Sequence, residues 1–381
     1  MKIYLSDPFV WAFLVIAFVW LQRTFMTLRA LHSVPVIRPS SDLPDIADCP
    51  LVSVIVPARN EENNIRQCIV SLLEQDYPKM EIIIANDNSV DRTEDIIRSF
   101  GERVICFNAP PTPPGWTGKN SALHAAVDKA SGEWLLFTDA DTRHERTSVS
   151  SAFRHALRHN LDFLTLTPRC LVDSLAEKMI QPGAMGYMGL WFPMDRINDP
   201  RNNLCFANGQ YLFMKRSAYQ LIGGHAAVRG EMLEDFAFMK KAKQHSVPFH
   251  CAFGVSVYGT RMYDTFSAIW RGWRRIYLHA FARDWASLLQ KSMSVFLFSF
   301  LPFVLYVSVL ARYAVNPSGL QAVVAGTATI ALMMVICTTV CAIMKVKLWY
   351  VIYHPVAALV LTLILLDAFR MAVTNGKTHW R

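Results

Sequence analysis

Three long stretches without a charged side chain lie in the last quarter of this 381-residue chain, and they constrain its fold more than any other feature. They cover residues 293–310, 320–344 and 348–366. Each approaches or exceeds the roughly 20 residues that a helix needs to cross the hydrocarbon core of a bilayer. Because lipid offers no hydrogen-bond partner to an open backbone, such stretches cross a membrane as helices. We therefore predict three transmembrane helices within residues 291–372 and a short tail at residues 373–381.

A fourth apolar stretch begins near the N-terminus. Residues 8–28 are apolar and aromatic apart from a short polar interruption at Gln22 and Arg23. They would span a bilayer if the arginine side chain extended to the interface. A cleaved signal peptide is the alternative, but one basic residue precedes the stretch and no convincing cleavage site follows it. We predict an uncleaved anchor at residues 1–30 and a linker rich in Pro, Ser and Asp at residues 31–50.

The basic residues next to these spans predict the orientation of the protein. Arg23, Arg29 and Arg38 follow the first span, and Lys345 and Lys347 form a short basic turn before the last one. Lys and Arg are enriched on the cytoplasmic side of membrane proteins. We therefore expect an integral protein of the cell (inner) membrane whose large central domain, which would carry any catalytic site, is cytoplasmic.

The net charge of +8 and the eight cysteines argue against other classes of protein. In a membrane protein an excess of Lys and Arg is typical of cytoplasmic faces and anionic lipid. No Lys/Arg tract of the DNA-binding kind is present, so no nucleic-acid partner is expected. The cysteines form no Cys-x-x-Cys pair, so the sequence predicts neither a disulfide framework nor a zinc site.

Between the spans, residues 51–262 alternate short apolar runs with amphipathic stretches. The runs predict strands at 51–56, 81–85, 104–107, 134–137, 163–167 and 255–259, and the amphipathic stretches predict helices at 63–74, 91–100, 118–130, 147–158 and 231–244. Strands and helices that alternate at this spacing form βαβ units with a mainly parallel sheet flanked by helices. The predicted fold class is α/β.

Polar clusters follow three of these strands, at residues 57–62, 86–91 and 138–141. Ligands of open parallel sheets bind beyond the carboxyl ends of the strands, so we expect the clusters to meet in one crevice. In the last cluster Asp139 and Asp141 are two residues apart and can face that crevice together. Two carboxylates suit Mg²⁺ or Mn²⁺ bound with a substrate diphosphate. A surface turn with two solvated acids is the alternative.

Four motifs resemble those of family 2 glycosyltransferases and occur in that family's order. They are Val-Ile-Val-Pro-Ala-Arg-Asn-Glu-Glu at 54–62, Asn-Asp-Asn-Ser-Val-Asp-Arg-Thr at 86–93, Gly-Lys-Asn-Ser-Ala-Leu at 118–123 and Asp-Ala-Asp at 139–141. The resemblance implies a Rossmann-like GT-A fold, a nucleotide-sugar donor, with a UDP-sugar as the expected one, and a divalent metal ion held by Asp139 and Asp141.

The resemblance also implies which side chains contact the donor. Pro57, Arg59 and Glu61 lie in the first motif, and Asp87 in the second is expected to contact the nucleobase. Asn86 departs from the family pattern, because many members have an acid there. The alternative for Asp87 is a helix N-cap or an Asx turn.

Lys119 follows a glycine-bearing loop, Gly-Trp-Thr-Gly, that opens a predicted helix. Backbone N–H groups and the helix dipole favour an anion at such a helix start. Lys119 could therefore reach a phosphate of the donor. A solvated lysine in the first turn of the helix is the alternative.

Glu234 and Asp235 open the last predicted helix of the domain. Sugar transfer to a hydroxyl needs a base for the hydroxyl proton. This pair resembles the family's Glu-Asp pair, whose Asp is the base in inverting members. The alternative is that both acids only complement the helix dipole. Gly209 and Gln210 lie in a segment that resembles the family's acceptor-side loop.

Residues 263–290 are rich in Trp, Tyr and Arg and are predicted to form interfacial amphipathic helices. Some lipid-using and processive family members have Gln-x-x-Arg-Trp here. In this chain Arg271 replaces the Gln and Arg275 the Trp, which argues against processive polymerisation. We expect Arg271 and Arg274 to contact the donor diphosphate, because guanidinium pairs with phosphate, and Trp273 to lie on the acceptor side.

A Met-rich apolar stretch at residues 171–189 is predicted to be a core helix. A surface that lies on lipid or binds an apolar substrate is the alternative.

Taken together, the sequence predicts metal-dependent, inverting transfer of a sugar from a nucleotide-sugar to a hydroxyl of a lipid or lipid-linked acceptor. Gly-Trp-Thr-Gly-Lys, Asn-Asp-Pro-Arg and the membrane tail resemble members associated with hopanoid or carotenoid lipids. A polyisoprenyl-phosphate sugar transferase or polysaccharide synthase is one alternative. A catalytically inactive membrane scaffold is another.

Overall fold

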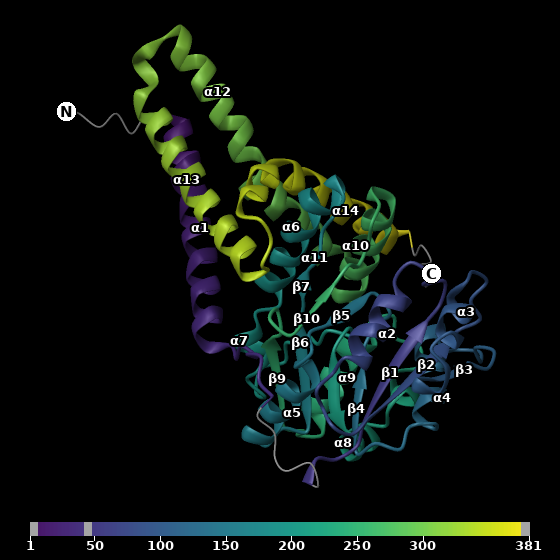
Figure 1. The fold of residues 1–381 in the computed structure, drawn as a ribbon. Helices are drawn as coiled ribbons and strands as arrows, with labels where there is room; N and C mark the ends of the chain where they lie inside the picture. The colour runs from purple at the N-terminus through teal and green to yellow at the C-terminus, as the bar shows by residue number, and fades with distance from the viewer. Residues whose placement is uncertain (1–6, 42–47, 375–381) are drawn as a thin grey trace. The chain divides into compact units, whose positions relative to one another are not determined.

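The computed structural model describes residues 7–41 and 48–374, which form two compact units (Figure 1). The first, called the sheet unit, comprises residues 33–41, 48–171 and 194–262 of the described chain. The second, called the helical unit, comprises residues 7–32, 172–193 and 263–374. Each unit is described by itself below.

The strands lie in the sheet unit. They are β1 (Val52–Ala58), β2 (Met80–Asn86), β3 (Ile105–Asn108), β4 (Trp134–Phe137), β5 (Thr142–His144), β6 (Phe163–Thr167), β7 (Arg169–Cys170), β8 (Leu212–Lys215), β9 (Phe249–Phe253) and β10 (Tyr258–Thr260). Within the described residues, seven strands form one sheet in the order β3-β2-β1-β4-β8-β6-β9, and β5-β10-β7 form a second, smaller sheet. In the larger sheet β8 runs antiparallel to both of its neighbours, and the other pairings are parallel.

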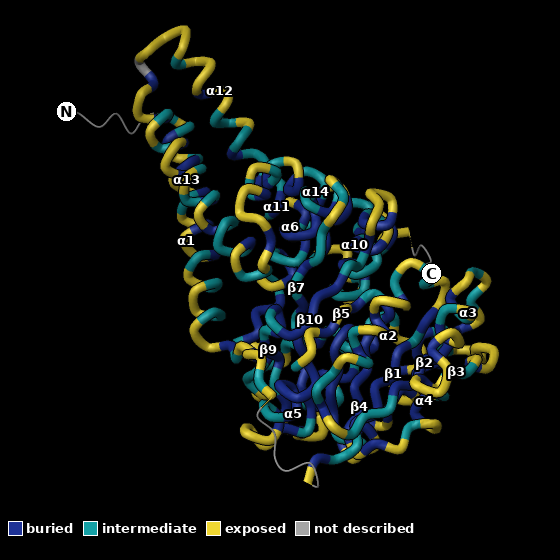
Figure 2. The backbone as a smooth tube through the Cα atoms, in the orientation of Figure 1, coloured by how far each residue is buried: buried dark blue, intermediate teal, exposed yellow. Residues whose placement is uncertain are grey.

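Helices cover the larger sheet and close the core of the sheet unit. They are α2 (Ile65–Leu73), α3 (Thr93–Arg98), η2 (Gly101–Arg103), α4 (Gly118–Val127), α5 (Ser148–Arg158), α7 (Met194–Ile197), α8 (Arg216–Leu221), η3 (His225–Val228) and α9 (Glu234–Gln244). The strands β1 and β4 are buried along almost their whole length, as expected for central strands covered on both faces (Figure 2). Trp134 of β4 stacks on Phe213 of β8, with 4.6 Å between the ring centroids.

The predicted α/β fold class with a mainly parallel sheet is confirmed. The sequence did not predict β9, because the half-buried His250 interrupts its short apolar run. Pairing with β6 holds this strand in the sheet. The strand predicted at 255–259 starts later, as β10. The strands β5 and β7, of three and two residues, are too short to show a periodic pattern.

The helical unit contains the apolar helices. They are α1 (Pro8–Ser33), α6 (Leu175–Trp191), α10 (Phe266–Ala280), α11 (Trp285–Val295), a π-helical turn (Phe296–Phe300), α12 (Leu301–Val315), η5 (Pro317–Gly319), α13 (Leu320–Ile343), η6 (Leu348–Tyr353) and α14 (His354–Val373). Four helical segments of the described chain are long and apolar enough to cross a membrane, at Pro8–Ser33, Trp285–Val315, Leu320–Ile343 and Leu348–Val373. The predicted arrangement of one N-terminal and three C-terminal spans is thereby confirmed.

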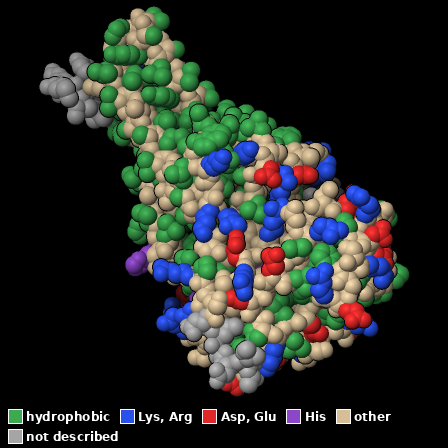
Figure 3. All heavy atoms as spheres, in the orientation of Figure 1, with side chains coloured by type: hydrophobic (Ala, Val, Ile, Leu, Met, Phe, Trp, Pro, Cys, Tyr) green, Lys and Arg blue, Asp and Glu red, His purple; other side chains and the backbone are tan. Residues whose placement is uncertain are grey.

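The surfaces of the two units differ in composition. Figure 3 shows hydrophobic side chains gathered on the helical unit, whereas Lys, Arg, Asp and Glu are spread over the sheet unit. Phe25, Val307 and Val335 are each more than half exposed on helices of the helical unit. Such side chains are suited to lipid contact rather than to water.

Two predicted boundaries differ from the structure. Residues 171–189 form most of α6, which packs against α10 and α14 and so belongs to the helical unit rather than to the domain at 51–262. The segment 263–290 contains a turn at Ala282 and Arg283, whose φ angles are 51° and 59°. The next helix, α11, then continues through the π-helical turn into α12, so the structure has no break at residue 290.

Candidate functional site

The polar clusters after β1, β2 and β4 lie at one edge of the larger sheet. These strands are parallel neighbours, with Val54 of β1 aligned with Ile82 of β2 and Leu136 of β4, so their carboxyl ends meet. The antiparallel strand β8 presents its amino end at the same edge, and this brings residues 208–211 to it. Because β8 runs in the opposite direction, residues 208–211 join the three predicted polar clusters at this edge as a fourth segment.

Asp141 follows β4 and is held by side chains from two other segments. Its Oδ1 lies 3.5 Å from Nε2 of Gln210 and 3.3 Å from Oγ1 of Thr260. Thr260 is at this position because β10 pairs with β5, which sets it opposite Thr142. Gln210 itself is fixed by its carbonyl, which accepts a hydrogen bond from Oγ1 of Thr138 at 2.8 Å.

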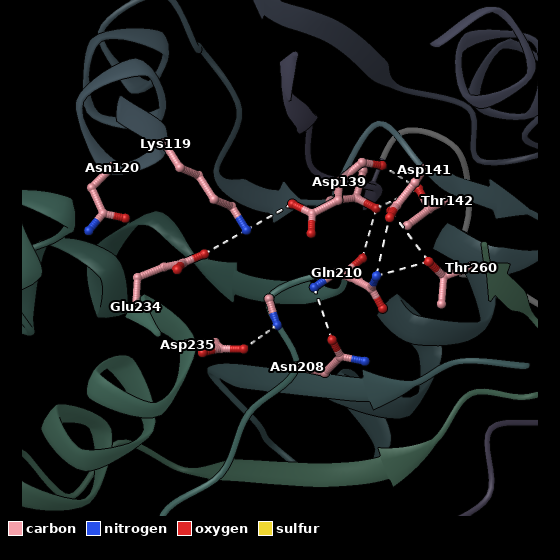
Figure 4. A network of polar contacts seen from close by, with 12 residues as sticks. Lys119, Asn120, Asp139, Asp141, Thr142, Asn208, Gln210, Glu234, Asp235 and Thr260 are labelled. Atoms are coloured by element: carbon pink, nitrogen blue, oxygen red, sulfur yellow. Dashed lines mark hydrogen bonds and ion pairs between the residues drawn. The ribbon is translucent and has the colours of Figure 1, made fainter. Parts of the chain in front are cut away.

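Lys119 connects the two sides of the site (Figure 4). Its Nζ lies 2.8 Å from Oδ1 of Asp139 and 2.7 Å from Oε1 of Glu234. The lysine side chain is only 6% exposed, so the alternative of a solvated lysine is wrong. Burial alone would lower the pKa of Lys119, but the two carboxylates raise it above its usual value. The ammonium group is therefore a permanent positive charge within the site.

Lys119 takes this position because α4 begins at Gly118. Oγ1 of Thr117 accepts a hydrogen bond from the N–H of Asn120 and caps the helix. The side-chain amide of Asn120 donates to the carbonyls of Val228 and Glu231 at 2.9 and 3.1 Å. Asn120 thus ties the loop before α9 to the start of α4.

Glu234 and Asp235 occupy the first turn of α9. Glu234 is buried, and Oδ2 of Asp235 accepts a hydrogen bond from the N–H of Gly209 at 2.8 Å. Burial and the neighbouring Glu234 carboxylate raise the pKa of Asp235 to about 7, although Lys119 and hydrogen bonds from backbone N–H groups oppose the shift. A carboxylate with a pKa near neutrality is well matched to proton transfer.

Two consecutive residues join the acids of the site. Gly209 contacts Asp235 through its N–H, and Gln210 contacts Asp141 through its side chain (Figure 4). A Cβ atom on Gly209 would lie 3.2 Å from Oε1 of Glu234 and 3.3 Å from Oδ2 of Asp235, so the acids approach this backbone closely. One lysine and four carboxylates therefore share one site. The four acids are Asp139, Asp141, Glu234 and Asp235.

The residues of this site fit a divalent cation bound together with a substrate. Within residues 7–41 and 48–374, no group of three or more His, Cys, Asp or Glu side chains is arranged to hold a metal alone. Asp139 and Asp141 supply two carboxylates, and an excess of acid over base surrounds them. Mg²⁺ and Mn²⁺ are commonly held by one or two carboxylates, with substrate phosphates and water as further ligands.

Asp87 follows β2 and lies close to the start of α4. It is 3% exposed, and its Oδ2 lies 3.3 Å from a terminal nitrogen of Arg59. A Cβ atom on Gly118 would lie 2.7 Å from Oδ2 of Asp87, so the helix can begin this close to the carboxylate only with glycine. Oδ2 of Asp87 thus lies at the helix start, while its Oδ1 accepts a long hydrogen bond from Nδ2 of Asn88 at 3.4 Å.

The local capping bonds that were the alternative role for Asp87 are made by neighbouring residues. Oδ1 of Asn86 accepts a hydrogen bond from the N–H of Ser89 at 3.2 Å, and Oδ1 of Asp91 accepts one from the N–H of Thr93 at 3.0 Å. Asn86 therefore caps its own loop at Ser89, and Asp91 makes an Asx turn at the start of α3. Neither of these local bonds uses the carboxylate of Asp87.

Pro57 and Glu61 link the first two loops of the edge. Pro57 is in β1, aligned with Ala85 of β2. The N–H of Glu61 donates to Oγ1 of Thr93 at 2.7 Å, and Oε2 of Glu61 accepts from Nδ2 of Asn64 at 2.9 Å. Their contact with a donor nucleoside remains a prediction.

Three predicted site residues lie on α10 of the helical unit and contact other parts of that unit. Trp273 is 3% exposed, and its Nε1–H donates to Oε1 of Gln181 at 2.7 Å. Arg274 forms an ion pair with Asp367 of α14 at 2.9 Å, and Arg271 donates to Ser267. Their predicted contacts with the diphosphate and the acceptor are not part of this arrangement and remain predictions.

Sequence reasoning missed Asn120, Asn208 and Thr260. Asn120 directly follows the lysine of the third motif, which was a usable signal. Asn208 accepts a hydrogen bond from the N–H of Gln210 and so shapes the loop between the acids. Thr260 is the last residue of a three-residue strand, and no local pattern identifies it.

Comparisons with known proteins give a family match and a shared fold. Residues 53–223 match the model of glycosyl transferase family 2. A 4,4'-diaponeurosporenoate glycosyltransferase from Staphylococcus aureus is 26% identical over 228 residues, which are 59% of this chain and 60% of that relative. The matched region thus spans less than two thirds of the relative.

A solved structure shares the fold. A mannosyltransferase from Pyrobaculum calidifontis, in complex with GDP-Man and Mn²⁺, aligns with a TM-score of 0.54 at 17% identity. The alignment covers 97% of this chain and all of that chain. The sheet unit therefore has the GT-A fold.

Proposed function

Because residues 53–223 match the model of glycosyl transferase family 2, we propose that this protein is a membrane glycosyltransferase that moves one sugar from a nucleotide-sugar to a lipid acceptor. The observation that carries the proposal is the convergence of acids from separate segments around Lys119, Gly209 and Gln210. A surface turn with solvated acids would not bury a lysine between Asp139 and Glu234.

The donor side consists of the loops after β1, β2 and β4. Asp87 would contact the nucleobase, and Asp139 and Asp141 would hold Mg²⁺ or Mn²⁺, which would bind together with the diphosphate. The cation would neutralise the diphosphate and the negative charge that grows on it as the nucleoside diphosphate leaves. The mannosyltransferase of the same fold holds GDP-Man with Mn²⁺, which supports a donor of this class. A UDP-sugar remains our expected donor.

The base is Asp235. Its carboxylate takes the proton of an acceptor hydroxyl while that oxygen attacks the anomeric carbon of the sugar. The bond from this carbon to the diphosphate oxygen breaks on the opposite side, so the configuration inverts. Lys119 pairs with Glu234 and Asp139 next to the reaction, and the N–H of Gly209 orients Asp235. Preorganised charges of this kind need no rearrangement during the reaction.

The acceptor is a lipid with a long apolar chain. Four helical segments able to span a membrane belong to the same chain. The relative from Staphylococcus aureus is named for a carotenoid acid, diaponeurosporenoate. The arginines near the end of the first span support a cytoplasmic location for the sheet unit.

The test is reconstitution of the full-length protein with Mn²⁺, a panel of radiolabelled UDP- and GDP-sugars, and a lipid extract of its own membrane. We expect a lipid product that carries a single sugar, identified by mass spectrometry. A product with a growing sugar chain would identify a polysaccharide synthase. Absence of nucleotide binding and of transfer with every donor would identify a scaffold and contradict the proposal.

A further inference from the structure

The helical unit contains an open, apolar cavity that the proposed chemistry does not use. The empty space in and around the cavity is about 670 Å³ when the open space at its mouth is included. Its walls come from α1, α6, α13, η6 and the start of α14. Apolar wall residues include Met179, Leu190, Ile336, Val340 and Val351.

The cavity also contains a buried positive charge. Arg23 of α1 lines it and is 7% exposed. Its guanidinium donates to the hydroxyls of Ser299 and Ser294, at 2.9 and 3.2 Å, and lies 4.8 Å from the ring centroid of Trp20. These neighbours are neutral. A buried charge without an opposite charge is costly, so an anion would find a favourable partner here.

Two further basic groups line the cavity, and no acid does. Lys178 of α6 and His354 of α14 are among its wall residues, whereas no Asp or Glu is among the wall residues in the described part of the chain. His354 is 8% exposed, and its Nε2 is buried without a hydrogen-bond partner. Its Nδ1 lies 3.4 Å from Sγ of Cys337. The second ring nitrogen is thus a polar atom that the fold itself does not satisfy.

We propose that this cavity binds the lipid acceptor, and that the acceptor is a single apolar chain that carries an anionic group. The aliphatic wall accommodates the chain, and Arg23, Lys178 and His354 receive the anion. Apolar walls supply affinity, and a few polar groups supply orientation. The identification of this ligand as the acceptor rests on the proposed function, whereas its binding in the cavity does not depend on catalysis.

The structure offers a matched pair of variants on α13. Val340 lines the cavity, and its Cγ1 would lie 3.1 Å from a Cβ atom on Gly186 of the opposite wall. Val335, on the same helix, is 64% exposed and does not line the cavity. V340F fills the cavity, and V335F makes the same change outside it.

The probe is cis-parinaric acid, a fluorescent polyene with one chain and a carboxylate, added to the detergent-solubilised full-length protein. We expect saturable binding to the wild type and to V335F, and at least tenfold weaker binding to V340F. Nucleotide binding should be the same in all three proteins, which separates failure of the cavity from failure of the proposed donor site. Equal binding to V340F and V335F would overturn the site.

The charge is tested with Arg23 and the methyl ester of the same probe. R23Q should lose most of the preference for the acid over the ester, by roughly tenfold, because hydrogen bonds to charged groups are stronger than those to neutral groups. R23K should keep that preference. If R23Q discriminated as the wild type does, the anion would bind elsewhere and the proposal would fail.

The assignment as the acceptor site is tested by competition. Parinaric acid should inhibit sugar transfer to the lipid acceptor with a potency that matches its binding constant, and V340F should abolish transfer while nucleotide still binds. A probe that binds in the cavity without inhibiting transfer would show that a bilayer lipid, and not the acceptor, occupies it.

Discussion

The sheet unit and the helical unit each bury a basic side chain, but they neutralise it differently. In the sheet unit Lys119 lies between the carboxylates of Asp139 and Glu234, and two more acids are close by. In the helical unit the neighbours of Arg23 are hydroxyls and aromatic rings. When its acids are ionised, the first site therefore has an excess of negative charge and the second an excess of positive charge.

This difference indicates what each site binds. Four carboxylates against one ammonium group favour a cation, and a divalent cation with a diphosphate fits the proposed donor site. A guanidinium in an apolar cavity requires an anion with an apolar chain. The same chain would thus hold a charged donor and a lipid acceptor in two units with opposite electrostatics. The following experiments test that contrast.

The largest expected effect is that of D235N. Removal of the base should lower the rate of transfer by about 10²–10⁴-fold, while donor binding and parinaric acid binding stay nearly unchanged. Steady-state transfer and nucleotide binding measure the two effects. D95N, which changes an exposed acid on α3, is the control. A D235N protein with most of its activity would show that Asp235 is not the base.

A smaller effect, on stability, should distinguish the two buried cations. K119M leaves Glu234 without its counterion and should lower the free energy of unfolding by about 3–5 kcal/mol. R23Q removes hydrogen bonds and aromatic contacts to neutral groups and should cost about 1–2 kcal/mol. Thermal unfolding in detergent gives the comparison, with K129M, at an exposed lysine in the turn after α4, as the control. Equal losses of unfolding free energy in K119M and R23Q would contradict the different neutralisation of Lys119 and Arg23.

The smallest effect is a shift in the pH profile of transfer. The base must be ionised, and the pKa of Asp235 is raised to about 7, so kcat/KM should fall tenfold per pH unit below that value and level off above it. E234Q removes the carboxylate that helps to raise this pKa, so its acid limb should move to lower pH. An unmoved limb would assign the titration to another group.

The fold was predictable where a residue pattern carries it. Central strands such as β1 and β4 are continuous apolar runs because both of their faces are buried. The membrane spans are long and free of charge because lipid surrounds them. By contrast, β5, β7 and β9 depend on pairing with strands that are distant in the sequence. That α6 belongs to the helical unit likewise depends on packing, which no local sequence pattern indicates.

The candidate site was predictable in its acids and less so in their connections. Asp139, Asp141 and Asp235 were identified by their places after strands or at a helix start, together with a family resemblance. The burial of Lys119 was not, because it depends on Glu234 from a distant helix. The contact of Thr260 with Asp141 arises from the register of β10 on β5. Arg271, Trp273 and Arg274 were chosen for their chemistry, and the structure places them in contacts within the helical unit.

The most direct test of the central claim, that acids of the sheet unit bind a nucleotide-sugar together with a divalent cation, is a titration of fluorescent nucleoside diphosphate. It compares the wild type and D141N, each with Mn²⁺ and with EDTA. We predict tight binding only to the wild type with Mn²⁺, and loss of both binding and transfer in EDTA that added Mn²⁺ reverses. Equal nucleotide affinity and transfer in EDTA, or in D141N, would contradict the account.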